Sequence, residues 1–146
     1  MQSIGDGAAF WLQAGPGMGK SSLVRELIHH AESLGARILL GMGESIHHAT
    51  PYHAWRPLLR HFMGIQETDS KARQIELIEN VLSKKFRWRS LSPLLSDILR
   101  LGVQDNHLTE QMVGVMRVFN TSKLICEILE LQAKEEPMVI ILEDAH

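Results

Sequence analysis

A glycine-rich stretch near the start of the chain, Ala14-Gly15-Pro16-Gly17-Met18-Gly19-Lys20-Ser21-Ser22, constrains the fold more than any other feature. It follows a short apolar run, residues 8–12, and it precedes a segment whose apolar residues recur at helical spacing. A strand, a glycine-rich turn and a helix in this order form the setting of a phosphate-binding loop. In such a loop the backbone N–H groups face an anion, and the positive end of the helix dipole adds to the attraction.

The residue types in this stretch predict nucleotide binding. Lys20 is expected to bind the β- and γ-phosphates, and the Ser21 hydroxyl is expected to ligate Mg²⁺. Ala14 stands where the usual pattern has a glycine, and its small side chain still permits a tight turn. The predicted binding segment runs from Ala14 to Ser22. The alternative is an ordinary glycine-rich turn, which the flanking strand and helix patterns disfavour.

The residues after the loop predict a helix over residues 19–34, ended by Gly35. Four residues at helical spacing are expected on its buried face: Leu23, Leu27, Ala31 and Leu34. Residues 37–40 predict a second strand, after which residues 41–43 turn the chain away. A strand, helix and strand completed by residue 43 favour a right-handed parallel unit.

The middle of the chain predicts helices. The first of them has apolar residues at i, i+3, i+4, i+7 and i+8: Trp55, Leu58, Leu59, Phe62 and Met63. Further helices are expected at residues 70–83 and about 115–133. Between these, Ser92 is the expected N-cap of a short helix, with Pro93 in its first position and Gly102 at its end. These helices form a predicted insertion at about residues 52–134.

The chain closes with an apolar run, residues 138–142, followed by Glu143 and Asp144. Acids at the carboxyl end of a parallel strand lie beside the crevice where ligands bind. We expect Glu143 to hold Mg²⁺ together with Ser21, and Asp144 to orient or deprotonate an attacking water. The sequence leaves open which acid is on the metal side. A plain strand end is the alternative, and the phosphate loop earlier in the chain disfavours it.

Composition narrows the partners and the compartment. A formal net charge of −2 gives no reason to expect nucleic acid or an anionic membrane as a partner. No apolar run approaches the ~20 residues that span a bilayer, and the N-terminus does not have the pattern of a signal peptide. The single cysteine, Cys126, cannot form an internal disulfide and is expected to be buried. We therefore expect a cytoplasmic location.

Two smaller features have functional and structural interpretations. Residues 84–89 mix basic and aromatic side chains, as nucleic-acid contacts do, but a helix end with Phe86 and Trp88 packed beneath it fits better. The histidines at positions 47, 48 and 53 suggest a metal site only weakly, because no further ligand pattern accompanies them.

With both nucleotide motifs present, the chain resembles the P-loop NTPases, and more narrowly the AAA-like ATPase module of the STAND class. The stretches that carry the resemblance are residues 15–27, 50–52, 91–102 and 137–146. Similar modules follow class III adenylate or guanylate cyclase domains and occur in large bacterial transcription regulators. The resemblance implies an α/β three-layer sandwich with a parallel sheet and a helical insertion between strands 2 and 3. It also implies ATP and Mg²⁺ as ligands and other domains of a signalling protein as partners.

The chain departs from the family pattern in three ways. No segment corresponds to the Gly-Arg-Glu type stretch with which family modules begin, Glu143 stands where the family more often has Asp, and the sequence stops at these acids. In the family, the strand that follows them lies between the strands of the two nucleotide motifs. We therefore expect residues 1–146 to be an incomplete P-loop domain, truncated after the strand that ends at Glu143. Unpaired strand edges are costly, so we also expect marginal stability.

Three functions follow from these expectations. The first is an ATP-binding module with slow, Mg²⁺-dependent hydrolysis that acts as a regulatory switch. The second is a nucleotide-dependent scaffold without hydrolysis, and the third is a small-molecule kinase. No guanine-reading motif is visible, so ATP is expected as the family's usual nucleotide.

Overall fold

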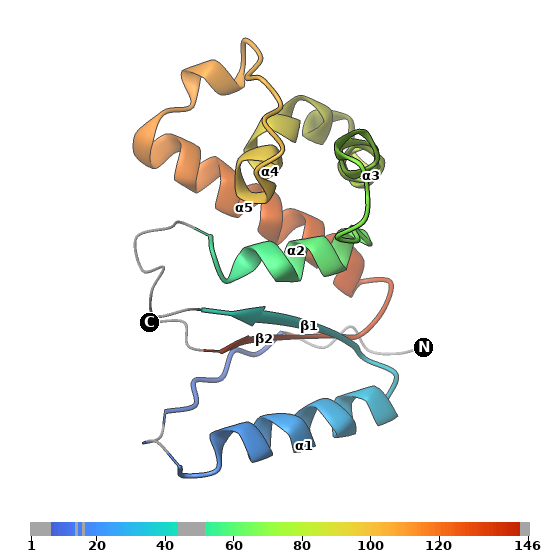
Figure 1. The fold of residues 1–146 in the computed structure, drawn as a ribbon, viewed down its shortest axis with the longest axis vertical. Coiled ribbons are helices and arrows are strands. Elements are labelled where there is room, and N and C mark those ends of the chain that lie inside the picture. Colours follow the sequence, from blue (N-terminus) through green and yellow to red (C-terminus); the bar gives the residue numbers. More distant parts are fainter. Residues whose placement is uncertain (1–6, 14, 16, 44–51, 144–146) are drawn as a thin grey trace.

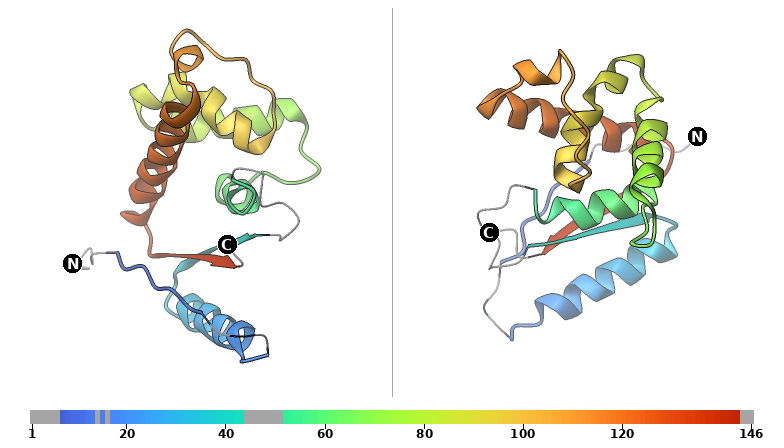
Figure 2. Two further views of the ribbon diagram at one scale, coloured as in Figure 1. Left: turned by 90° about the vertical axis from the view of Figure 1, so that its left-hand side faces the viewer. Right: turned by 45° about the horizontal axis from the view of Figure 1, so that its top comes forward.

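The computed structural model describes residues 7–13, 15, 17–43 and 52–143, and these residues form three layers (Figure 1). Helix α1 (Lys20–Ser33) lies on one side of a sheet formed by β1 (Arg37–Met42) and β2 (Met138–Glu143). On the other side lies a group of helices between residues 52 and 134, which we call the helical unit. Its elements are α2 (Trp55–Met63), α3 (Lys71–Leu82), η2 (Phe86–Leu91), α4 (Ser92–Leu99), η3 (Thr109–Gln111) and α5 (Gly114–Ala133). Figure 2 shows the same separation from two further directions.

The two strands pair in parallel, as the sequence predicts. The register runs from Arg37 opposite Met138 to Met42 opposite Glu143. Leu39 in β1 is fully buried, and α2 covers this face of the sheet. The α/β class and the parallel sheet are thus confirmed for the described residues, although the sheet there has only two strands.

The predicted first strand, residues 8–12, is wrong. The segment has no regular secondary structure, and Phe10 and Trp11 are 93% and 79% exposed. An apolar run forms a strand only where its backbone N–H and C=O groups find a partner edge. In the described part of the chain only β1 and β2 pair, so this run has the composition of a buried strand without the pairing.

Helix α1 forms where predicted but buries a different face. Ala31 is buried and Val24 and Ile28 are half-buried, a stripe at i, i+4 and i+7. Leu23 and Leu27, expected inside, are 53% and 49% exposed. These leucines stay exposed because the sheet is narrow. Its two strands cover only one stripe of the helix, whereas the apolar residues of the helix span a wider arc.

The helical unit encloses the main hydrophobic core. Its fully buried members come from every long helix of the unit and from η2, and they include Leu58, Leu59, Ile78, Leu82, Trp88, Leu94, Leu95 and Leu124. Trp88 is buried as expected, whereas Phe86 and Cys126 are exposed. None of the described helices has the length and apolar character needed to cross a membrane.

The start of α4 also differs from the prediction. Ser92 is not its N-cap but its first residue, because η2 runs through Leu91 directly into the helix. Pro93 lies in the first turn as expected, where its missing N–H breaks no helical hydrogen bond.

Candidate functional site

The glycine-rich loop ends in a backbone conformation that favours glycine. Gly17 has φ 75° and Gly19 has φ 83°, both in the left-handed region that L side chains rarely adopt. The Gly19 carbonyl accepts hydrogen bonds from Ser22 N at 3.1 Å and Leu23 N at 3.0 Å, so the loop passes directly into α1. The predicted order of glycine turn and helix is therefore present in the structure. Ala14 and Pro16 lie outside the described residues.

The first turn of α1 suits an anion. It contains no acidic residue, and within the described part of the chain no side chain caps the amino end of the helix, so the groups described there leave the positive end of the dipole open to an anion. Lys20, Ser21 and Ser22 are exposed there. A Cβ built at Gly17 or Gly19 would meet no atom within 4 Å, so the space beside the loop is open. The described residues thus fit a phosphate group.

Glu143 is the last residue of β2, and this end of β2 lies on the same side of the molecule as the amino end of α1. It is half-buried, lies opposite Met42 in the strand register, and its carbonyl accepts a hydrogen bond from Gly43 N at 2.8 Å. In Figure 1 the carboxyl ends of both strands and the amino end of α1 lie at the left-hand edge. Figure 2 agrees, since the carboxyl ends of the two strands and the amino end of α1 all face the viewer in its left-hand view. Asp144, the second predicted acid, lies outside the described residues.

The structure adds a contact at this edge that the sequence analysis missed. Residues 41–43 were predicted to be a turn, but β1 continues through Met42. A Cβ at Gly41 would overlap the carbonyl oxygen of Ala54 and the side chain of Leu142. Gly41 therefore lets the residue just before α2 lie against the carboxyl end of β1. A glycine inside an apolar strand is the signal that indicates such a close approach.

A metal site built from protein side chains alone is not found among the described residues. Among the residues that the structure describes, no group of three or more His, Cys, Asp and Glu side chains could hold a metal ion. His47 and His48 lie outside this set. The predicted Mg²⁺ site differs from such a cluster, because it relies on Ser21, Glu143 and the phosphates of the nucleotide itself.

Comparison with known proteins gives one match. Neither curated proteins nor solved structures yielded a similar chain. A family model described as "AAA ATPase domain" matches residues 3–146, and so includes the glycine-rich loop, the helical unit and the terminal acids. This family implies nucleotide binding and ATPase chemistry, generally with ATP and Mg²⁺. Because the match spans nearly the whole sequence, the chain belongs to the AAA ATPase domain family.

Proposed function

We propose that the chain is the ATP-binding core of a STAND-class regulatory switch, which hydrolyses ATP slowly within a larger cytoplasmic signalling protein. The observation that carries the proposal is the position of the glycine-rich loop. This loop leads into a helix whose amino end has no side-chain cap among the described residues, at the same edge as Glu143. The resemblance to modules that accompany nucleotide cyclase domains and transcription regulators supports the signalling role. Other domains of the same protein are then the expected partners.

Four side chains have separate roles in this proposal. Lys20 binds the β- and γ-phosphates as a point charge, and the N–H groups of the loop surround the same oxygens. Ser21 and Glu143 hold Mg²⁺, which when bound neutralises charge on the phosphate oxygens. Asp144 orients the attacking water and accepts its proton as the water oxygen bonds to the γ-phosphorus. The bond from that phosphorus to the bridging oxygen breaks, which releases ADP and phosphate.

Calorimetry with Mg²⁺-ATP tests the binding half of the proposal. Charge-assisted hydrogen bonds contribute about 1.5–3 kcal/mol each, so Lys20→Ala is expected to weaken binding by roughly ten- to over a hundredfold. Lys71→Ala is the matched control, because Lys71 is an exposed lysine at the start of α3 in the helical unit. Equal affinity of the Lys20→Ala variant and the unmodified chain would contradict the proposed site.

Turnover separates a switch that hydrolyses ATP from a scaffold that only binds it. We expect hydrolysis in the full-length protein, and Glu143→Gln and Asp144→Asn should each abolish its phosphate release. Binding without any turnover would instead support the non-catalytic scaffold. Transfer of phosphate to a small acceptor would support a kinase.

A further inference from the structure

Three arginines lie near one another where α2 packs against the end of α4. Arg56 and Arg60 are four residues apart on α2, so they share one face of the helix. Nε of Arg56 donates to the carbonyl of Ile98 at 2.8 Å, and Arg100 follows two residues later as the C-cap of α4. We call Arg56, Arg60 and Arg100 the arginine cluster.

The charges of the arginine cluster repel one another. Burial lowers the pKa of Arg56 from its ordinary value, and the neighbouring positive charges of Arg100 and Arg60 lower it further. A guanidinium nevertheless stays protonated in a protein at neutral pH, so the repulsion persists. An anion bound at the cluster would relieve this repulsion.

The hydrogen-bond partners of the arginine cluster within the described part of the chain are all neutral. Besides the Ile98 carbonyl, they are Gln74 Oε1 and the carbonyl of Gln66, which accept from Arg60 Nη1 and Nη2, each at 3.1 Å. None of the three arginines forms an ion pair with another described residue. Their hydrogen bonds therefore satisfy donors without offsetting charge.

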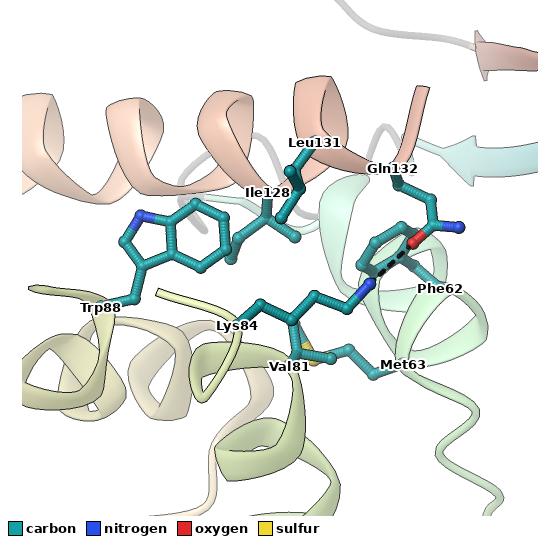
Figure 3. Close-up of a pocket in the computed structure, with 8 residues that line it drawn as sticks. All are labelled: Phe62, Met63, Val81, Lys84, Trp88, Ile128, Leu131 and Gln132. Carbon is teal, nitrogen blue, oxygen red and sulfur yellow. Dashed lines mark hydrogen bonds between the residues drawn. The ribbon is translucent and has the colours of Figure 1, made fainter. Parts of the chain in front are cut away.

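Other cations of the helical unit do have a carboxylate partner. Lys84 donates to Gln132 Oε1 at 3.2 Å (Figure 3), and its ammonium lies 3.7 Å from Glu135 Oε2. Arg117 Nη2 lies 2.6 Å from the carboxylate of Asp97, the acidic residue of α4. These acids are therefore already engaged, and the arginine cluster stands out as a group of positive charges that the described residues leave uncompensated.

The backbone at Arg100 is a second, independent outlier. Its φ of 58° and ψ of 43° lie in the left-handed region, which glycine adopts freely and L side chains rarely adopt. Helix α2 ends in the same conformation with Gly64, the usual residue type there. Such outliers concentrate at functional sites, and this one places a third guanidinium beside Arg56.

We propose that the arginine cluster docks a phosphorylated serine or threonine side chain of another protein segment. Such a phosphate has a charge of about −1.5 to −2 at pH 7 and three acceptor oxygens, so one group offsets most of the charge of the cluster. Guanidinium groups match phosphate oxygens in geometry.

The exposure of the cluster favours a phosphate carried on a chain. Arg100 is exposed, and Arg56 and Arg60 are half-buried, so the site is open to solvent. Sites for small molecules enclose most of their ligand, whereas arginine clusters recognise phosphorylated segments at a protein surface. The site is additional to the nucleotide edge, because it uses neither Lys20 nor Glu143.

The Nε–H signals of arginine in NMR spectra of the whole chain test the proposal. The probe is a blocked tripeptide, acetyl-glycyl-phosphoseryl-glycine amide, and the signal of Arg56 is expected to shift and saturate as the probe is added. The tripeptide with unmodified serine should cause no shift, and the one with glutamate should bind roughly threefold more weakly or worse, since its charge is smaller. Arg89, exposed on η2, is the internal reference.

Three results of this titration would overturn the proposal. They are an Arg56 signal that does not shift, equal shifts of Arg56 and Arg89, and binding of the glutamate tripeptide as tight as that of the phosphoserine tripeptide. The last result would indicate an acidic, unphosphorylated segment instead.

Arg100→Gly separates the proposed role from a structural one. Affinity for the phosphoserine tripeptide should fall roughly threefold or more, because one charge is lost. The midpoint of thermal unfolding should stay the same or rise, because glycine adopts this φ without strain. Arg89→Gln is the matched control and should bind the probe as the unmodified chain does. Unchanged affinity in Arg100→Gly, or the same loss in Arg89→Gln, would refute the proposal.

A double comparison keeps this site distinct from the nucleotide edge. Lys20→Ala should weaken Mg²⁺-ATP binding and leave the probe-induced shift of Arg56 unchanged, whereas Arg100→Gly should weaken probe binding alone. Loss of the Arg56 shift in Lys20→Ala would contradict a separate site.

Discussion

Arg37 and Glu136 connect the amino ends of the two strands, although they are 99 residues apart in the sequence. Arg37 Nη1 donates to Glu136 Oε1 at 3.0 Å, and its Nη2 donates to the backbone carbonyl of Phe62 at 2.9 Å. The guanidinium also lies 5.0 Å from the centre of the Phe62 ring. One side chain therefore holds β1 to the segment before β2 and to the end of α2 at once.

This arrangement predicts unequal effects of two substitutions. Arg37→Met should lower the free energy of unfolding by about 1–3 kcal/mol, because it removes both the ion pair with Glu136 and the hydrogen-bond donor to the Phe62 carbonyl. Glu136→Gln should cost less, about 0–1 kcal/mol, since the pair is partly exposed and the amide still accepts a hydrogen bond. Urea unfolding of both variants provides the measurement, and equal losses would show that the Phe62 contacts contribute nothing.

A methyl group at Gly41 should disturb the contact between β1 and α2. Gly41→Ala places its Cβ against the carbonyl of Ala54, a backbone atom that cannot rotate away. We expect a loss of about 1–3 kcal/mol in unfolding free energy. Gly7→Ala is the matched control, because nothing lies within 4 Å of a Cβ at that position, and it should be nearly neutral. Thermal unfolding that does not distinguish the two variants would argue against the close approach.

Substitutions at two glycines with left-handed backbone conformation should distinguish effects on stability from effects on nucleotide binding. Gly19 and Gly35 have φ 83° and 75° and lie at opposite ends of α1. Changing either to Ala should cost about 1–2 kcal/mol of stability through backbone strain. Only Gly19→Ala should also weaken Mg²⁺-ATP binding, since it alters the loop that meets the phosphates. Calorimetry at a temperature where both variants are folded checks this, and a matching loss of affinity in Gly35→Ala would contradict it.

Acid should destabilise the helical unit partly through Glu127. The indole N–H of Trp88 and, secondarily, the Arg87 guanidinium 2.6 Å away lower the pKa of this carboxyl from its usual 4.5. A carboxyl with a depressed folded-state pKa stabilises the fold above its unfolded-state value, and this contribution is lost as the pH falls through the folded-state pKa. The stability advantage of the unmodified chain over Glu127→Gln should therefore shrink between about pH 5 and pH 3.

Urea unfolding across that pH range measures the effect. Glu130→Gln is the control, since Glu130 is an exposed carboxylate of α5 that forms no ion pair in the described part of the chain. An advantage over Glu127→Gln that stays constant with pH would contradict the assigned role of Glu127.

Periodicity predicted most elements of the fold because it records which face of each helix is apolar. The spacing of Leu58, Leu59, Phe62 and Met63 placed α2, and these four residues are buried. The same reasoning failed for α1, since several residues of a wide apolar arc could face the sheet and only the width of the sheet selects among them. It also failed for Phe10 and Trp11. The composition of a segment can indicate that it suits a strand, but it does not show whether another strand is available to pair with it.

At the candidate site the structure bears only on the backbone of the loop. Gly17 and Gly19 have positive φ, which agrees with the tight glycine-rich turn that the sequence predicts, because this requirement is local to each residue. The roles of Lys20, Ser21 and Glu143 remain predictions, and so do those of Ala14, Pro16 and Asp144.

The parallel pairing of β1 with β2 has a consequence for the order of folding. The two strands can meet only after the long chain between them has been drawn together, and closing so long a loop is slow unless local structure shortens it. The helices between the strands make mostly local contacts and can form early. Folding kinetics should therefore show the helical unit becoming compact first, with the sheet completed in the last step, when β2 pairs with β1.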